Sequence, residues 1–195
     1  MSRAQVVGKV GFQLPLDPNS FSPRGPQVAC VTGASRGIGL GIALRLARDG
    51  CEFFKLLSRS RSLYTVAVDV TINDIAANQA GIDLAVNAIE SLGRKAVGVV
   101  ADVTDEEQVE QMVAKTVEAL GSLDVMVANA GVCQVKPLLE TTAADRQFIM
   151  DVNVHGLMNT FVSAARQMVK QGKGGWIIGA CVHHFPCDFA RTLTM

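Results

Sequence analysis

The stretch Val31-Thr32-Gly33-Ala34-Ser35-Arg36-Gly37-Ile38-Gly39 decides the fold of this chain. A short apolar run at residues 27–31 precedes it, and residues 40–49 follow it with a helical spacing of apolar side chains that ends at Gly50. The order is therefore strand, glycine turn and helix. Glycines allow backbone N–H groups to approach a pyrophosphate, and the start of the next helix adds partial positive charge. Taken alone, the stretch also fits a helix-capping turn that binds no ligand.

Length and composition limit the class of protein. At 195 residues and 49% hydrophobic content, the chain fits one globular α/β domain. Its 18 basic residues balance 18 acidic ones, so charge indicates neither nucleic acid nor a membrane surface as a partner. No apolar run approaches the ~20 residues of a membrane helix, and we expect no secretory signal. Five cysteines without framework spacing fit reduced thiols, so a cytoplasmic location is expected.

Strands alternate with amphipathic helices along the rest of the chain. Further strand-like runs lie at residues 65–72, 96–101, 123–128 and 175–179. The pattern Thr104-x-x-Glu107 predicts a capping box for the helix that ends at Gly121, and a long helix is predicted from about Thr142 to Gly172. The alternation predicts an α/β fold with a doubly wound parallel sheet covered by helices, a three-layer αβα sandwich.

Three segments depart from this alternation. Residues 1–26 hold four of the six prolines and are expected to be a flexible extension. Residues 51–64 delay the acid at the end of the second strand, Asp74, by roughly fifteen residues beyond its usual place. This segment is either a surface loop insertion or sequence that is not part of the mature protein, such as an unremoved intron read in frame. Residues 182–195 fit no element, which leaves 27–181 as the predicted dinucleotide-binding domain.

Several separate motifs resemble those of the short-chain dehydrogenase/reductase family. The T-G-x-x-x-G-x-G spacing of residues 32–39 has the family's form, and Asp102-Val103 follows the third strand. Asn129-Ala130-Gly131 follows the fourth strand, and residues 151–156 resemble the pattern V-N-x-x-G. Residues 123–181 look most like diacetyl/acetoin reductases and butanediol dehydrogenases. The resemblance implies a Rossmann-type sheet of strand order 3-2-1-4-5, truncated here after the fifth strand. It also implies an NAD(P)-dependent oxidoreductase that reduces a small diketone or hydroxyketone by hydride transfer.

The resemblance also implies which residues bind the cofactor. In the family the acid after the third strand holds the adenine amino group, the next residue's backbone contacts the ring, and the N-A-G backbone passes beneath the adenosine ribose. The implied cofactor-binding residues are Thr32, Gly33, Ser35, Arg36, Gly37, Ile38, Gly39, Asp74, Asp102, Val103, Asn129, Ala130 and Gly131. Asp74 would accept hydrogen bonds from the ribose hydroxyls and favour NAD, whereas the Arg36 cation would suit the 2′-phosphate of NADP. NAD is therefore the expected cofactor, with NADP as the alternative. Asp124 is implied to stabilise the sheet.

Most catalytic residues of the family are missing from this sequence. The family's asparagine, which interrupts a helix and holds a water linked to the catalytic lysine, corresponds to Asn153, the candidate catalytic residue. The family also uses a tyrosine as general acid/base, a lysine four residues later and a serine. Here Val182 stands at the serine position, the only tyrosine is Tyr64, and no lysine follows Lys173. The chain is therefore predicted to be catalytically impaired. The alternatives are a non-catalytic dinucleotide-binding module and a truncated or mis-spliced product without independent activity.

The sequence predicts neither a metal site nor a certain oligomeric interface. Cys181-x-His183-His184-x-x-Cys187 offers zinc-type ligands, but four ligands within seven residues leave little loop for a tetrahedral cage, so no metal is predicted. Full-length relatives are homo-oligomers by the resemblance, whereas the elements that usually build their interface are missing here. The fifth strand would then be an exposed edge. The expected partner is a small-molecule carbonyl or alcohol substrate.

Overall fold

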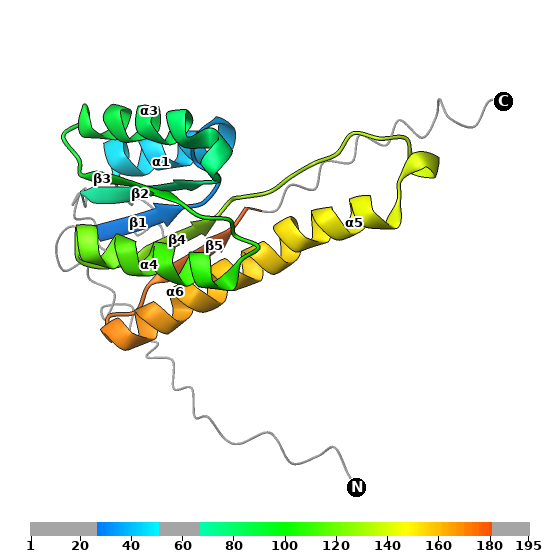
Figure 1. Cartoon of the computed structure of the whole chain (residues 1–195). Helices are drawn as coiled ribbons and strands as arrows, with labels where there is room; N and C mark the ends of the chain where they lie inside the picture. The colour runs from blue at the N-terminus through cyan, green and yellow to red at the C-terminus, as the bar shows by residue number, and fades with distance from the viewer. Residues whose placement is uncertain (1–26, 51–66, 181–195) are drawn as a thin grey trace, which may run out of the picture.

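The computed structural model describes residues 27–50 and 67–180. Within them one parallel sheet has the strand order β3-β2-β1-β4-β5, which confirms the predicted order. The strands are β1 (Gln27–Val31), β2 (Val68–Asp74), β3 (Ala96–Val100), β4 (Val125–Ala128) and β5 (Trp176–Gly179). Figure 1 shows α1 and α3 on one face of this sheet and α4 and α6 on the other. The described part of the chain is therefore the three-layer αβα arrangement that the alternation of strands and helices predicted.

The helices follow the predicted order. They are α1 (Gly37–Asp49), α3 (Gln79–Glu90), α4 (Glu106–Leu120), α5 (Ala143–Met150) and α6 (Leu157–Gln171), with short turns η1 (Ala76–Asn78), η2 (Leu138–Glu140) and the π-helical η3 (Asp151–Gly156). Small buried residues, Ala43 and Ala47, lie on the face of α1 that packs against the sheet, and larger ones, Ile82 and Ile89, lie on that of α3. Each apolar stripe buries one side of a helix against the strands.

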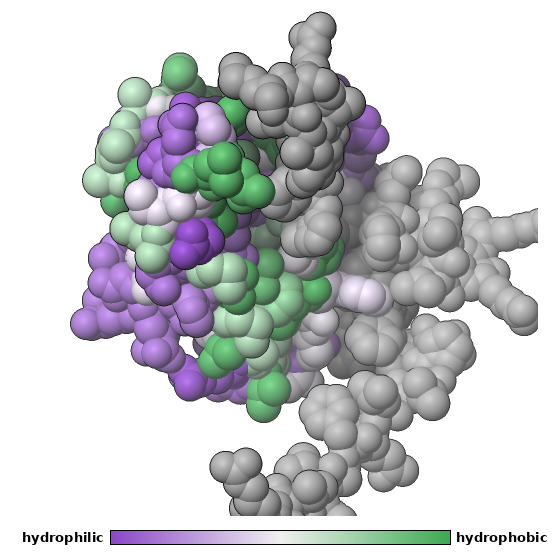
Figure 2. Space-filling model, turned by 90° about the vertical axis from the view of Figure 1, so that its right-hand side faces the viewer, coloured by the Kyte–Doolittle hydropathy of each residue, from purple (hydrophilic) through white to green (hydrophobic). Residues whose placement is uncertain are grey.

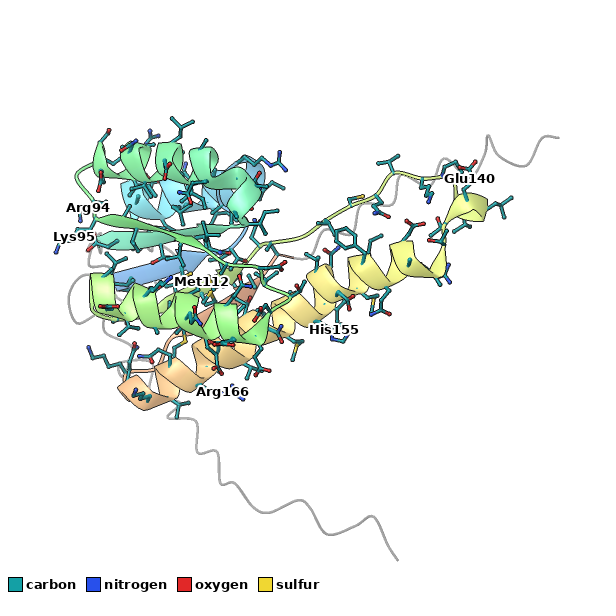
Figure 3. The ribbon with its side chains drawn as sticks, in the orientation of Figure 1. Arg94, Lys95, Met112, Glu140, His155 and Arg166 are labelled. Carbon is teal, nitrogen blue, oxygen red and sulfur yellow. The ribbon has the colours of Figure 1, made fainter. Side chains whose placement is uncertain are left out.

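Two apolar cores lie on the two faces of the sheet. The core under α1 and α3 includes Val70 and Ile72 of β2, and the core under α4 and α6 includes Met126 of β4. Met112 of α4, labelled in Figure 3, belongs to this second core and is fully buried. Burying a side chain of this size stabilises the fold by about 1.5–3 kcal/mol. Strands buried on both faces explain the continuous apolar runs in the sequence.

The capping box predicted at Thr104 and Glu107 is wrong by one residue. Asp105 is the N-cap of α4, and its Oδ1 accepts a hydrogen bond from the N–H of Gln108 at 3.1 Å. Gln108 Nε2 donates back to Asp105 Oδ2 at 2.9 Å. Both threonine and aspartate can cap a helix, but the Thr104 hydroxyl donates instead to Asp102 Oδ1 at 2.8 Å. Asp105 therefore caps α4 in place of Thr104.

The long helix predicted from Thr142 to Gly172 is one helical run of three parts, α5, η3 and α6. Thr142 begins it with a capping box, in which Thr142 Oγ1 accepts from the N–H of Asp145 at 3.1 Å and Asp145 Oδ2 accepts from the N–H of Thr142 at 2.8 Å. Gly172 ends it in the left-handed conformation, with φ 66°. In Figure 1 the α5 end of this run projects away from the sheet.

Asp124 links three strands, in agreement with its predicted structural role. Its Oδ2 accepts hydrogen bonds from the N–H of Val28 at 2.9 Å and from Ser122 Oγ at 2.7 Å. Its carbonyl accepts from the N–H of Trp176 at 2.9 Å. In the described part of the sheet β5 pairs with β4 alone, and Ile178 of β5 is 43% exposed. β5 is thus one of the two edge strands of the described sheet, opposite β3.

Several predictions lie outside the described residues. They concern the N-terminal extension, the segment 51–64 with Tyr64, the tail from 182 onward and the candidate zinc ligands from Cys181 to Cys187. Of the two cysteines that the structure describes, Cys30 is buried and Cys133 is exposed. Burial raises the pKa of the Cys30 thiol to about 12, so it is protonated and unreactive at neutral pH.

Candidate functional site

The glycine turn lies at the carboxyl end of β1. Gly33 and Gly37 have φ values of 62° and 60°, a left-handed conformation that glycine adopts without strain. A Cβ at Gly39 would collide with the Gly33 carbonyl oxygen and would lie 2.5 Å from Asn129 Nδ2. A Cβ at Gly37 would meet no atom within 4 Å. The turn is therefore tightly packed beneath Gly39 and open at Gly37.

The first turn of α1 is left without a protein cap. Arg36, the N-cap residue, is exposed and makes no side-chain capping hydrogen bond, and the first turn contains no acidic residue. Ile38, in the same turn, is 66% exposed. The first N–H groups of a helix have no partner within the helix and carry partial positive charge. This helix start can therefore bind an anionic group such as a phosphate.

The N-A-G motif after β4 packs directly against the glycine turn. Thr32 Oγ1 accepts hydrogen bonds from the N–H groups of Asn129 and Ala130, both at 3.0 Å. Asn129 Nδ2 donates to the carbonyls of Thr32 at 3.0 Å and Gly33 at 3.2 Å. A Cβ at Gly33 would lie 2.9 Å from the Cα of Ala130. The structure thus brings together two motifs that are almost a hundred residues apart in the sequence.

Asp74, at the end of β2, holds the turn from the other side. Its Oδ2 accepts from the N–H of Ser35 at 3.2 Å and from Ser35 Oγ at 2.5 Å. Its Oδ1 accepts from the N–H of Ile75 at 2.9 Å and from Asn78 Nδ2 at 2.8 Å. Burial raises the pKa of this carboxyl, but the hydrogen bonds from Ser35, Asn78 and Ile75 outweigh burial and lower it. A ribose hydroxyl would have to share this ionised carboxylate with Ser35, which sequence reasoning did not foresee.

The loop after β3, residues 101–104, is fixed by neighbouring side chains. Asn73 Nδ2 donates to the carbonyl of Ala101 at 3.1 Å, and the N–H of Asp102 donates to Gln108 Oε1 at 3.0 Å. Asp102 Oδ1 accepts from both the N–H and the hydroxyl of Thr104, at 2.9 and 2.8 Å. Sequence reasoning missed Asn73 and Gln108, because side-chain amides that bind distant backbone have no local signature.

This loop leaves one donor and one acceptor side by side in the chain. Asp102 Oδ2 accepts no hydrogen bond from residues 27–50 and 67–180, and the N–H of Val103 donates none to those residues, although Val103 is only 5% exposed. A buried N–H usually has a partner. Adenine presents an amino donor at N6 beside an acceptor ring nitrogen. The free pair in the loop is complementary to that edge.

Asn153 lies in the π-helical turn η3 and binds the backbone that follows Gly131. Its Oδ1 accepts from the N–H of Val132 at 2.8 Å, and its Nδ2 donates to the carbonyl of Val132 at 2.9 Å. π-Helical turns are often found at functional sites. Each group of the amide can still make one more hydrogen bond. The role of Asn153 in holding a catalytic water stays a prediction.

A cavity of about 380 Å³ adjoins the loop after β3. Its lining residues are Asp102, Thr104, Phe148, Asp151, Val152 and His155. Figure 3 labels His155 on the helical run that lies beside this loop. The volume lies within the ~300–1,000 Å³ of small-molecule pockets. Sequence analysis identified Asp102 as a site residue but not Phe148, since a lone aromatic residue on an amphipathic helix gives no binding signal.

None of the helices within residues 27–50 and 67–180 is long and apolar enough to cross a membrane. Among the same residues, no group of three or more His, Cys, Asp or Glu side chains is placed to hold a metal ion.

Comparison with known proteins places the chain in a family. A family model described as short chain dehydrogenase matches residues 60–183. A short-chain dehydrogenase/reductase of Armillaria gallica is 48% identical over 155 residues, which cover 80% of this chain and 53% of the relative. An L-2,3-butanediol dehydrogenase of Corynebacterium glutamicum is 35% identical over 172 residues, 86% of this chain and 60% of the relative.

Solved structures agree with this result. A short-chain type dehydrogenase/reductase from Mycobacterium marinum has a TM-score of 0.69 at 30% identity, covering 83% of this chain and 60% of that one. The chain spans about half the length of the first curated relatives it matches. Its fold, its glycine turn and its sequence relatives point the same way: the chain belongs to the short-chain dehydrogenase/reductase family of oxidoreductases.

Proposed function

We propose that this chain binds NAD at the carboxyl edge of its sheet. One observation carries the proposal: an uncapped helix start and an unpaired donor–acceptor pair lie at the ends of strands of the same parallel sheet. In open α/β sheets, ligands bind outside the carboxyl ends of the strands. The first feature suits a pyrophosphate and the second suits adenine.

The residues present fit such a dinucleotide. Residues 33–39 would hold the pyrophosphate through backbone N–H groups, and Asp102 with Val103 would hold the adenine. The ionised Asp74 would repel a 2′-phosphate and so favours NAD, whereas the exposed cation of Arg36 is the feature that would admit NADP. When bound, the nicotinamide would accept or supply a hydride.

The reaction is proposed to be the reduction of a small diketone or hydroxyketone of the diacetyl or acetoin type. Its support is the motif resemblance and the likeness to the butanediol dehydrogenase of Corynebacterium glutamicum. The 195-residue chain is proposed to turn over poorly. Its only tyrosine is Tyr64, in the segment before β2, and no lysine follows Lys173. The tyrosine and lysine that move the proton in the family therefore have no counterpart among the described residues.

A second candidate function follows from the same observation. With a site that binds the adenosine half of a dinucleotide, the chain would serve as a non-catalytic dinucleotide-binding module. A truncated or mis-spliced product without activity of its own is the third possibility, and sequencing the transcript distinguishes it. The cytoplasmic location, the small-molecule partner and the assembly state stay predictions.

Titration calorimetry on the purified 195-residue chain tests the proposal. We expect NAD to bind with a measurable heat and more tightly than NADP. A parallel assay of NADH oxidation with diacetyl should give a rate far below the ~1–10³ s⁻¹ of enzymes. Absence of NAD binding by a folded chain would reject the proposed cofactor, and an ordinary enzymatic rate would reject the catalytic impairment.

A further inference from the structure

Asn159 of α6 reaches the loop after β3 from the opposite face. Its Nδ2 donates to the carbonyl of Val103 at 3.0 Å and to the carbonyl of Thr104 at 3.4 Å. More than fifty residues separate Asn159 from this loop in the sequence. The side chain is half-buried, and neither the periodicity of α6 nor any family motif in the sequence singled it out.

The backbone of the helical run comes unusually close to the same loop. Gly156, the last residue of the π-helical turn, is buried, and a Cβ there would lie 2.6 Å from Val103 Cγ2 and 3.2 Å from Val103 Cβ. Real Cβ atoms are not found at such distances, so only glycine permits this approach. Gly156 and Asn159 are three residues apart, on one face of the helix. Gly156 allows the helix to lie close to Val103, and Asn159 donates a hydrogen bond to the Val103 carbonyl.

These contacts fix the peptide that carries the free N–H of Val103. On its N-terminal side, Gln108 binds the N–H of Asp102, and the carbonyl of Asp102 accepts from the N–H of Asp105 at 3.1 Å. On its C-terminal side, Asn159 binds the next two carbonyls. With these peptides held, the N–H of Val103 and the Oδ2 of Asp102 keep a constant spacing.

We propose that Asn159 is a positioning residue for recognition of the adenine base, an inference that rests on the proposed function. It contacts the loop rather than the base. By holding the carbonyls of Val103 and Thr104, it keeps the Val103 donor and the Asp102 acceptor in register with the ring nitrogen and amino group of adenine. Loss of this hold leaves the pyrophosphate site at the glycine turn intact, because the turn is braced by other residues, Asn129 and Asp74.

A dinucleotide with an altered base separates base recognition from general binding. In nicotinamide hypoxanthine dinucleotide the amino group is replaced by a carbonyl oxygen and the ring nitrogen carries a hydrogen, so both hydrogen bonds to the loop are reversed. A site built for one pattern rejects the other because its polar groups are left unpaired. The full 195-residue chain should therefore bind NAD at least about tenfold more tightly than the hypoxanthine analogue.

The test compares the wild type with Asn159→Asp, which keeps the shape of the side chain but replaces the donor by a carboxylate facing two carbonyls. We expect affinity for NAD to fall about tenfold or more while affinity for the analogue stays within about twofold, so that the preference disappears. Asn159→Ala, which removes the donor without adding charge, should reduce the preference in the same direction. Asn87→Asp, the same change on the exposed face of α3, should leave it unchanged.

The outcomes distinguish the inference from the function beneath it. A wild type that binds neither dinucleotide rejects the proposed function, and the inference with it. A wild type that binds both equally well overturns the inference alone. An equal loss of affinity for both dinucleotides in the Asn159 variants, accompanied by a lowered melting temperature, would show a merely structural side chain and would also overturn it.

Discussion

Two regions differ in how the described residues hold them: the proposed adenosine-binding end of the site, made of the glycine turn and the loop after β3, and the exposed segment between Gly131 and α5. At the adenosine end Thr32 and Ser35 are 1% and 6% exposed, and side chains from β2, from α4 and from the N-A-G motif bind the glycine turn and the loop after β3. In the segment between Gly131 and α5, Val135 is 100% exposed and Leu139 is 97% exposed. The glycine turn and the loop after β3 are held by hydrogen bonds from distant side chains, whereas the segment between Gly131 and α5 lies on the surface.

The segment between Gly131 and α5 is held mainly by local contacts. Lys136 Nζ donates to Asp145 Oδ2 at 2.8 Å, and this ion pair together with the Thr142 cap holds the pKa of Asp145 well below its usual range. Exposed ion pairs of this kind add little stability. Figure 2, which views the face from which α5 projects, shows apolar residues gathered in its middle. Exposed apolar residues of this region are Val135, Leu138, Leu139, Phe148, Met150 and Val154.

From this difference we expect the proposed adenosine-binding end to bind a dinucleotide without help from the segment between Gly131 and α5. The hydrogen bonds of the adenosine end join β1, β2, β3 and β4, which are all in place, whereas the segment before α5 has apolar side chains with no cover among the described residues. We therefore expect changes at the adenosine end to alter dinucleotide binding strongly and changes in the exposed segment to alter it little.

The largest effect is expected from Gly39→Val. A side chain there would displace the Gly33 carbonyl and the Asn129 amide, and misplacing a binding group by ~1 Å can cost about 100-fold. Overpacking should also lower the unfolding free energy by about 1–3 kcal/mol. Calorimetry with NAD and thermal unfolding measure both effects. The control is Gly41→Ala, also in α1. Its Cβ meets nothing within 4 Å, so the unfolding free energy should rise by about 1 kcal/mol. Similar NAD affinity in both variants would contradict the claim that close packing beneath Gly39 is needed for binding.

A smaller effect is expected from Asp74→Asn. The change removes the negative charge and keeps the shape, so the ratio of NADP affinity to NAD affinity should rise by about tenfold. Competition between the two cofactors in calorimetry measures the ratio. Asp83→Asn, an exposed acid of α3, serves as the control and should leave the ratio alone. If Asp74→Asn lowers both affinities without changing their ratio, Asp74 only braces the turn and does not select the cofactor.

The same variant should reveal a pH dependence of stability. The folded-state pKa of Asp74 lies below the ordinary ~3.9, so its contribution to stability is fully present above about pH 4 and is lost as the pH falls through the folded-state value. The gap in unfolding free energy between wild type and Asp74→Asn should therefore be largest near neutral pH and should narrow in acid. Urea unfolding at several pH values measures it, and a gap that widens in acid would contradict the sign.

The smallest effect is expected from Leu139→Ser in the exposed segment. Because this side chain is almost wholly exposed, the unfolding free energy should change by no more than about 0.5 kcal/mol. Affinity for NAD should stay within about twofold. A loss of NAD binding as large as that of Gly39→Val would mean that the two regions are not independent.

Much of the fold could be predicted from the sequence because it depends on local patterns. Apolar runs between turn residues predicted the strands, and their alternation with helices predicted a parallel doubly wound sheet. The order 3-2-1-4-5 was predicted from the family resemblance, since more than one order fits that alternation. The start of the long helix at Thr142 also followed from the chain nearby. Where two neighbouring residues could both cap a helix, as at Thr104 and Asp105, only the packing of Asp102 decided between them.

The candidate site was predicted less completely. Glycines and acids at strand ends have a recognisable spacing, so Gly33, Asp74 and Asp102 could be identified from the sequence. The amides that hold them, Asn78 and Asn159 among others, could not, because their partners are set by tertiary packing. The engagement of both Asp74 oxygens by protein donors was likewise invisible, since spacing shows where a carboxylate lies but not which donors surround it.

Hydrogen exchange of the 195-residue chain with and without NAD tests the central claim most directly. Amides in residues 33–39 and 101–104 should exchange more slowly when NAD is added, while those in 133–141 exchange fast in both conditions. That result would establish an adenosine-binding end that works on its own. Protection by NAD confined to residues 133–141, or fast exchange of the whole sheet without any response to NAD, would contradict it.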